Sequence, residues 1–241
     1  MRRDRLAPVL AIVGGAIVLV VAIVVASQIS NNSNKSSADN IKTDSIAEML
    51  QGVPQKGISL GDPKAKLTLV EISDPQCPYC ADWAREVFPT LVQNYVRTGK
   101  LRIEYQGLAF LDDRSATKDS DRLLALAQAA GLQNKLWNVV ELEFENQGTE
   151  NTGYATDAFL KGIVEAVGPG LNAGKAISVA DTNAVVPMIN AAQKLAETKI
   201  GNEISTPTFL LGPTGSTQTE KIVGALPLAT FTKAIDAQLK K

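Results

Sequence analysis

Two cysteines three positions apart are the residues of this chain best suited to chemistry. Cys77-Pro78-Tyr79-Cys80 lies directly between a predicted strand and a predicted helix. At a helix N-terminus, the unpaired N–H groups and the helix dipole stabilise a sulfur anion. The thiolate is the reactive form of cysteine, so this placement predicts that Cys77 is the nucleophile. Cys80, one turn further on, is predicted to be shielded and to resolve a mixed disulfide formed at Cys77.

Two other interpretations of the cysteine pair stay open. A static disulfide would close so short a loop that it removes little entropy from the unfolded chain. A metal site built on two thiolates would need further donors, and the chain has three methionines and no histidine. The spacing favours an exchangeable dithiol over both, so no metal is predicted.

Composition excludes several other kinds of site. The chain has 241 residues, 45% of them hydrophobic and 20% charged, as in a globular protein. Its formal net charge of −1 gives no reason to expect a nucleic-acid surface. The lack of histidine excludes Ser-His-Asp and Cys-His catalysis and His-ligated metals. Two cysteines also exclude a zinc site made of four thiolates from one chain.

A proline at the start of a later predicted strand is the second candidate for the site. Pro207 stands in the run Thr206-Pro207-Thr208-Phe209, and a proline is tolerated at the first residue of a strand. One interpretation is an ordinary strand-start proline. The other is a cis proline that faces the dithiol and presents the Thr206 backbone to an extended substrate.

The N-terminal region predicts a location outside the cytosol. Residues 6–26 carry no charged side chain and would form a helix of roughly 31 Å, about the thickness of a bilayer core. Three arginines against one aspartate before this run favour a cytoplasmic N-terminus. A cleaved signal peptide ending at Ala26 is the alternative, although the run exceeds the usual h-region. Both predict an extracytoplasmic domain, where disulfides persist.

The rest of the chain reads as one α/β domain with a helical insertion. Residues 27–40 are rich in Ser and Asn and predict a flexible tether. A short helix at 46–50 and an extended approach through 54–63 follow. The predicted strands are 67–73, 101–106, 208–212 and 218–223, and the predicted helices are 77–97 with an interruption at Pro89, 119–131, 134–147, 155–167, 183–199 and 227–240. The predicted divisions are 1–27 (cytoplasmic tip and transmembrane anchor), 28–56 (tether and short helix) and 57–241 (the folded domain, with its helical insertion at about 115–203).

This order of elements resembles the thioredoxin superfamily. Within it, the chain resembles the DsbA-like extracytoplasmic thiol-disulfide oxidoreductases, including the membrane-anchored bacterial type. The matching segments are GISLGDPKAKLTLVEISDPQCPYC (57–80), ELEFENQ (141–147) and STPTF (205–209). The resemblance implies a thioredoxin-like α/β fold with a helical insertion, preceded by the transmembrane helix, and a cis peptide bond before Pro207.

The resemblance also implies roles for single residues. Glu71, six residues before Cys77, stands where these families place a buried acid, and it would relay a proton to or from Cys80. It shares a predicted strand face with apolar residues, which would raise its pKa; an exposed strand glutamate is the alternative. Pro78 and Tyr79 would tune the dithiol. Unfolded polypeptide would be seated by Thr206, Pro207 and Phe209.

The implied function is a membrane-tethered oxidoreductase that introduces disulfide bonds into exported proteins. No cofactor is implied, because the dithiol is itself the redox group. The implied partners are unfolded or thiol-bearing exported proteins and a quinone-linked membrane oxidoreductase of the DsbB or vitamin K epoxide reductase type. Two alternatives stay open: a disulfide isomerase or reductase of the same superfamily, and a non-catalytic thioredoxin-like binding module.

Two positions depart from DsbA proper. The residue before the second cysteine is Tyr79 where DsbA has histidine, and Thr206 replaces a bulky apolar residue before the proline. Without a neighbouring imidazolium, the Cys77 thiolate loses one stabilising charge. The sequence therefore predicts a less extreme oxidant than DsbA.

Overall fold

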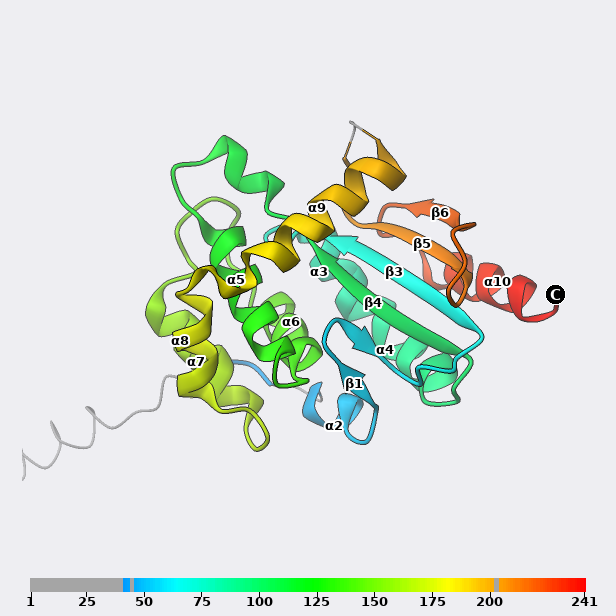
Figure 1. Cartoon of the computed structure of the whole chain (residues 1–241), viewed down its shortest axis with the longest axis horizontal. Helices are drawn as coiled ribbons and strands as arrows, with labels where there is room; N and C mark the ends of the chain where they lie inside the picture. Colours follow the sequence, from blue (N-terminus) through cyan, green and yellow to red (C-terminus); the bar gives the residue numbers. More distant parts are fainter. Residues whose placement is uncertain (1–40, 44–45, 202–203) are drawn as a thin grey trace, which may run out of the picture.

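A central β-sheet organises the molecule (Figure 1). A computed structural model describes residues 41–43, 46–201 and 204–241. The sheet has six strands in the order β1-β2-β4-β3-β5-β6, in which β3 runs parallel to β4 and antiparallel to β5. The strands are β1 (Gln55–Lys56), β2 (Ser59–Leu60), β3 (Leu67–Ser73), β4 (Leu101–Gly107), β5 (Thr208–Pro213) and β6 (Glu220–Val223). The four predicted strands are therefore confirmed, and they form the centre and one edge of the sheet.

Helices cover both faces of this sheet and form a separate block at one side. In Figure 1, α9 crosses one face, α3 and α4 lie behind the other, and α5 to α8 form the block. The helical segments are α2 (Ile46–Leu50), α3 (Pro78–Glu86), α4 (Phe88–Leu91), the π-helix η2 (Val92–Val96), the 3-10 helix η3 (Phe110–Arg114), α5 (Asp119–Gly131), α6 (Leu136–Glu145), α7 (Asp157–Val167), α8 (Ala173–Ala180), the 3-10 helix η4 (Asn183–Val185), α9 (Val186–Ile200) and α10 (Leu228–Leu239). The helical insertion between β4 and β5 is thus confirmed.

The residue alternation in the two central strands decides which side chains face α3. Along β4, buried Leu101, Ile103 and Tyr105 alternate with half-buried residues. Side chains two apart on a strand share a face. On β3, Leu67 and Leu69 join the main apolar cluster with Tyr105 and Trp83 of α3. Glu71 is the next residue of that face, so the strand carries a carboxyl into the core.

A set of aromatic rings fastens the helical block to the sheet. Phe88 of α4 stacks on Trp137 of α6 with ring centroids 5.2 Å apart and planes 8° apart. Tyr105 of β4 meets the same indole edge-on at 6.0 Å. All three rings are almost completely buried. The insertion therefore shares one core with the sheet.

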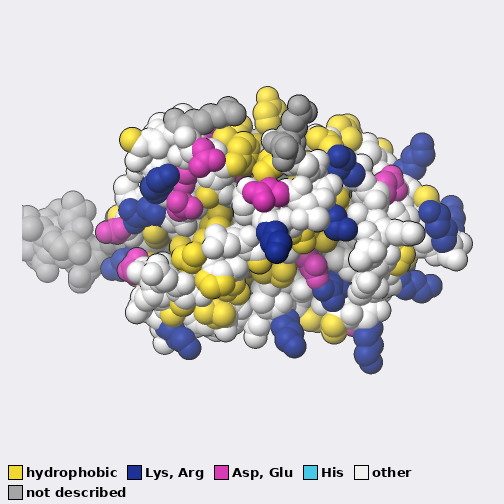
Figure 2. Space-filling model, turned by 45° about the horizontal axis from the view of Figure 1, so that its top comes forward, with side chains coloured by type: hydrophobic (Ala, Val, Ile, Leu, Met, Phe, Trp, Pro, Cys, Tyr) yellow, Lys and Arg dark blue, Asp and Glu magenta, His cyan; other side chains and the backbone are white. Residues whose placement is uncertain are grey.

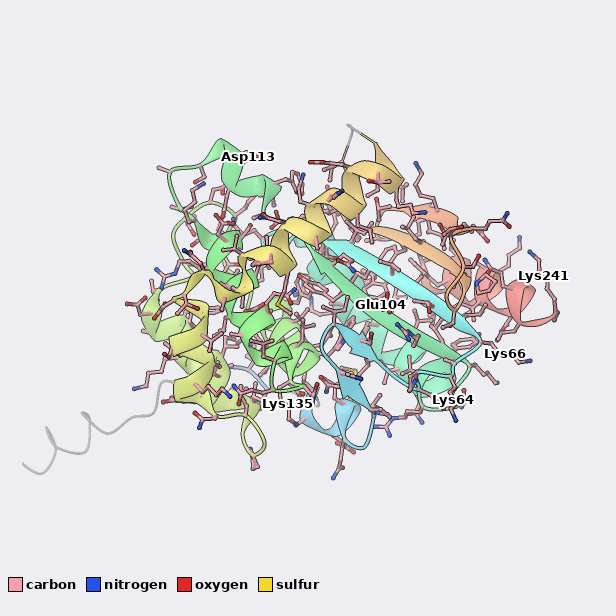
Figure 3. The ribbon with its side chains drawn as sticks, viewed as in Figure 1. Lys64, Lys66, Glu104, Asp113, Lys135 and Lys241 are labelled. Carbon is pink, nitrogen blue, oxygen red and sulfur yellow. The ribbon has the colours of Figure 1, made fainter. Side chains whose placement is uncertain are left out.

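The dithiol lies at the end of the sheet where β3 and β4 finish. Figure 3 labels Lys66, just before β3, at the opposite end. Figure 3 also labels Asp113 of η3, the segment that follows β4. Asp113 lies towards the end of the sheet at which β3 finishes and the chain enters α3. The charged side chains on the face shown in Figure 2 are of both signs and are interspersed with apolar ones. This distribution agrees with the near-neutral formal charge.

Three predicted elements need correction. The helix predicted at 77–97 consists of α3, α4 and η2, and its break falls at Val87, two residues before Pro89, which occupies the first turn of α4. The approach predicted at 54–63 contains the antiparallel pair β1 and β2, which extends the sheet beyond β4. Helix α8 was not predicted; it has only eight residues, and Ala176 is the one among them that is buried.

The predicted membrane span is outside the part of the chain that the structure describes. Residues 6–26, and the tether up to residue 40, precede the first described residue. Among the described residues, no helix combines the length and the apolar content needed to cross a bilayer. The anchor and the division of the chain at 27 and 56 remain predictions.

Candidate active site

Cys77 is the N-cap residue of α3. Its backbone is extended (φ −70°, ψ 120°), and Pro78 occupies the first turn, where the lack of an N–H is harmless. The backbone N–H groups of Cys80 and Ala81 donate to the Cys77 carbonyl at 3.1 and 3.3 Å. These two bonds close the first turn of α3. The predicted position of the first cysteine is confirmed.

Several groups lower the pKa of the Cys77 thiol from 9.0 to about 6. The largest cause is a hydrogen bond from the Cys80 side chain; burial opposes it. The Thr206 side chain and the backbone N–H groups of Cys80 and Tyr79 act in the same direction as Cys80. At neutral pH most Cys77 side chains are therefore thiolates, which is the nucleophilic form.

Cys80 behaves in the opposite way although it has the same side chain. It is completely buried, and both cysteines are free thiols in this structure. Burial, followed by the hydrogen bond and the negative charge of Cys77, raises the pKa of Cys80 well above its usual value. The shielding predicted for the second cysteine is confirmed, and the two thiols have sharply different acidities.

Glu71 lies fully buried on β3, as its apolar neighbours on the strand predicted. Burial raises its pKa from 4.5 to about 7, and a hydrogen bond from Ser73 opposes the rise. The Ser73 hydroxyl donates to Glu71 Oε1 at 2.6 Å, and the Ser73 side chain lowers the pKa of Cys80, against the effect of burial. Ser73 thus influences both the carboxyl and the buried thiol. The sequence analysis did not identify this serine.

The peptide bond between Thr206 and Pro207 is cis, as the resemblance implied. Cys77 Sγ lies 3.5 Å from the Thr206 carbonyl oxygen, to which the protonated thiol donates, and this places the segment beside the dithiol. Thr206 and Pro207 are both buried by neighbouring residues. The fold therefore brings the C-x-x-C segment and the distant Thr-Pro segment together.

The prediction for Phe209 is wrong. Its side chain is completely buried, with ring centroids 4.6 Å from Trp83 and 4.9 Å from Phe231. It supports α3 from within the core and cannot contact a polypeptide on the surface. The residue fails as a substrate contact because strand β5 is buried along almost its whole length, so both of its faces are internal.

Exposed apolar side chains instead lie near Cys77 and Pro207. Tyr79 is 65% exposed, next to the first cysteine. The Gly224 N–H donates to the Pro207 carbonyl at 2.8 Å, which holds the turn after β6 against the cis proline. Val223, the last residue of β6, and Leu226 in this turn are 45% and 38% exposed. These side chains are apolar surface on the segments that carry the dithiol and that contact the cis proline.

Residues of the helical insertion hold the loop before Cys77. Asp74 accepts hydrogen bonds from the Gln76 N–H, the Leu111 N–H and the Ser120 hydroxyl, at 2.9, 3.1 and 2.6 Å. Gln147 donates to the Cys77 carbonyl at 3.1 Å. The loop is thereby fixed from two directions. No spacing in the sequence marks these contacts, because their partners lie far apart along the chain.

The sequence profile of the thioredoxin family matches residues 54–237. The chain belongs to this family. Its relatives include a probable disulfide bond formation protein D from Bacillus cereus, 30% identical over 128 residues, and one from Bacillus anthracis, 29% identical over 128 residues. These matches cover 52% of this chain and 56% of each relative, so the chain spans little more than half of their length.

Solved structures share the fold of this thioredoxin-family chain. BdbD from Bacillus subtilis, in the oxidised form, superposes with a TM-score of 0.65 at 17% identity, covering 78% of this chain and 98% of that one. The α-DsbA1 of Wolbachia pipientis gives a TM-score of 0.63 at 22% identity, covering 81% and 96%. The DsbA-like arrangement, with the helical insertion, is therefore shared at the level of the fold.

Proposed function

We propose that this chain is an extracytoplasmic, membrane-tethered thiol-disulfide oxidoreductase that introduces disulfide bonds into exported proteins through Cys77 and Cys80. The observation that carries the proposal is the opposite shift of the two thiol pKa values, with Cys77 lowered to about 6 and Cys80 raised. A stable Cys77 thiolate stabilises the reduced form, which makes the Cys77–Cys80 disulfide oxidising, and it leaves readily from the mixed disulfide with a substrate. The printed names of the Bacillus relatives support the same activity.

The reaction proceeds in two exchanges. A substrate thiolate attacks Cys77 of the disulfide form, the bond to Cys80 breaks, and Cys80 leaves as a thiolate that takes up a proton. A second substrate thiolate then attacks the substrate sulfur of the mixed disulfide, and Cys77 leaves as a thiolate. The substrate loses two electrons and gains a disulfide, while the cysteine pair becomes a dithiol.

The surroundings of the dithiol supply the remaining roles. Glu71 exchanges a proton with Cys80, Pro78 and Tyr79 tune the pair, and Thr206 with Pro207 seats an extended polypeptide beside Cys77. The exposed side chains of Tyr79, Val223 and Leu226 suit the apolar segments of an unfolded chain. The dithiol is the redox group and no further cofactor takes part.

Residues 6–26 supply the anchor in this proposal. They place residues 57–241 outside the membrane, where substrates are exported proteins that carry free thiols. A quinone-linked membrane oxidoreductase, of the DsbB or vitamin K epoxide reductase type, would accept the two electrons and restore the disulfide. The length and apolar character of residues 6–26 support this arrangement.

The direction of electron flow is tested by two measurements on the full chain. Equilibration with glutathione should give a reduction potential between about −270 and −120 mV, the values of thioredoxin and DsbA. Trapping of thiols in cells should find the pair as a disulfide. If the pair is mainly reduced in cells, the function is that of the isomerase or reductase alternative rather than disulfide formation.

The nucleophile is tested by trapping. In Cys80→Ala, Cys77 attacks oxidised glutathione and the mixed disulfide persists, because no second thiol can displace the glutathione. Mass spectrometry should therefore find one glutathione on each chain, and none in the matched Cys77→Ala variant. If neither variant, nor the unsubstituted chain, forms an adduct, the chain is a binding module without catalysis.

A further inference from the structure

The residue before Cys77 is fastened to the helical insertion by its side chain. Gln76 is buried, and its side-chain amide donates to Asp112 Oδ1 and to Ser120 Oγ, both at 2.8 Å. Its side-chain carbonyl accepts from the Asn151 N–H, also at 2.8 Å. These three partners all come from the region between β4 and β5. The position of Cys77 therefore depends on how the insertion is docked.

The ELEFENQ segment (141–147), at the end of α6, reaches the same loop through its last residue. Gln147 Nε2 donates to the Pro75 carbonyl at 2.8 Å and to the Cys77 carbonyl at 3.1 Å. A side-chain amide nitrogen carries two protons, so one glutamine supplies each carbonyl with a donor of its own. The two bonds connect Pro75 to Cys77 across the residue between them. The entry into α3 is thereby held from outside the loop.

The Cys77 carbonyl is the point at which the backbone turns into α3. It also accepts from the N–H groups of Cys80 and Ala81, so three donors meet at one oxygen. Cys77 is the N-cap residue, and its extended backbone (φ −70°, ψ 120°) is the conformation that directs an N-cap side chain towards the N–H groups of the first turn. Fixing this carbonyl therefore helps to fix the Cys77 sulfur relative to those N–H groups.

We propose that Gln147 is a positioning residue for the nucleophile, and that through it the helical insertion sets how readily the Cys77–Cys80 pair is reduced. This inference rests on the proposed function. Both bonds of Gln147 reach backbone oxygens, so it acts through the position of Cys77. At the helix start, backbone N–H groups and the helix dipole stabilise the thiolate. A stabilised thiolate favours the dithiol over the disulfide, so the loss of Gln147 should make the pair less oxidising.

Three variants of the full chain separate this role from packing. Gln147→Leu removes the donor, and Gln147→Glu keeps the size of the side chain but brings a negative charge towards Cys77. Gln133→Leu is the matched control. Gln133 likewise uses its side-chain amide to hold backbone in the insertion, since it accepts from the Asn172 N–H at 3.0 Å and donates to the Asn172 carbonyl at 3.3 Å.

Equilibration with glutathione measures the effect on the dithiol. Two glutathione thiols reduce the disulfide to the dithiol and are released as one oxidised glutathione. In Gln147→Leu the equilibrium constant should shift towards the protein disulfide by about two- to tenfold, which is the net contribution of one hydrogen bond. The midpoint of the pH dependence of Cys77 alkylation by iodoacetamide should rise in parallel, because less thiolate forms. Gln147→Glu should shift both further, since its charge opposes the thiolate, and Gln133→Leu should change neither.

Urea unfolding of each variant checks that the fold is intact. If Gln147→Leu does not fold, Gln147→Glu decides alone, because it keeps the shape of glutamine. An unchanged equilibrium constant and pH midpoint in the folded Gln147 variants would overturn the positioning role. Equal shifts in Gln147→Leu and Gln133→Leu would overturn it as well, because they would reflect a general loosening of the insertion. If the unsubstituted chain does not exchange with glutathione at all, the proposed function fails instead.

Discussion

Cys77 and Cys80 have identical side chains, and their surroundings move their pKa values in opposite directions. Cys77 lies at the start of α3 with backbone N–H groups and the Cys80 thiol directed at it. Cys80 is one turn deeper and has lost all contact with solvent. Each thiol affects the other, because a negative charge on Cys77 makes a second charge on Cys80 unfavourable. Cys77 is therefore the nucleophilic thiolate, and Cys80, one helical turn away, remains a protonated thiol.

The Cys80 hydrogen bond can be tested by comparing two substitutions. Cys80→Ala removes the largest cause of the low pKa of Cys77, whereas Cys80→Ser keeps a donor at the same position. At pH 6.5 we expect Cys77 in the alanine variant to react with iodoacetamide about tenfold more slowly than in the serine variant, because less thiolate is present. Equal rates, with equal midpoints in the pH dependence, would assign the low pKa to the helix N-terminus alone.

At the site, the sequence predicted what depends on local pattern. The reactive cysteine follows from C-x-x-C at a helix start, and the burial of Glu71 follows from strand alternation. Ser73 was missed because its effect on Cys80 becomes visible only when β3 and α3 are placed together, whereas its hydrogen bond to Glu71 lies within β3. Phe209 was misjudged for the same reason, since its burial depends on α3 and α10.

The boundaries of elements were predictable where a breaker residue or a clear apolar alternation marks them. Gly168 ends α7 with φ +72°, a backbone conformation that favours glycine, and the predicted end at 167 agrees. The pair β1 and β2 was missed because each strand has only two residues and no periodicity to detect. Such short strands form because the sheet edge at β4 offers partners, which is a tertiary effect.

The contact of α4 with α6 should account for a large share of the stability of the insertion. Phe88 is completely buried and stacks on Trp137 at 5.2 Å. Phe88→Ala should lower the free energy of unfolding in urea by about 3–5 kcal/mol, the usual cost of such a cavity. Leu132→Ala, at a position 56% exposed, is the control and should change it by less than about 0.5 kcal/mol. A loss below 1 kcal/mol for Phe88→Ala would mean that the insertion docks without this stack.

On the scale of the whole molecule, the insertion and the sheet form one working unit. The loop before Cys77 is bonded to Leu111, Ser120 and Gln147, all of which follow β4. The buried acids come from both parts, with Glu71 on β3 and Glu141 on α6. Stability and chemistry are consequently coupled, because the Glu71 carboxyl that is buried on folding is also the acid proposed to exchange a proton with Cys80.

Buried carboxyls with raised pKa values should make the folded protein less stable as pH rises. The pKa of Glu71 is about 7 in the folded state and 4.5 as its ordinary value, and that of Asp74 is about 7 against 3.8. Between these limits the unfolded chain has released protons that the folded chain retains, so the free energy of unfolding falls with increasing pH. The stabilisation is complete below about pH 4 and is lost as the pH rises through 7.

Glu71→Gln isolates the share of one carboxyl in this effect. Below pH 4.5 the unfolding free energies of the variant and the unsubstituted chain should differ by a constant amount. From there to about pH 8 the unfolding free energy of the variant should rise relative to that of the unsubstituted chain, by up to about 3 kcal/mol for a shift of this size. Cys77, whose pKa is lowered, contributes with the opposite sign between pH 6 and 9, but it is present in both proteins and cancels in the comparison. Urea unfolding of the full-length reduced chains from pH 4 to 8 measures the difference, and Glu145→Gln serves as the half-buried control. Parallel curves for Glu71→Gln and the unsubstituted chain would show that Glu71 is already ionised in the folded protein, and a neutral acid could then no longer supply the proton that Cys80 takes up.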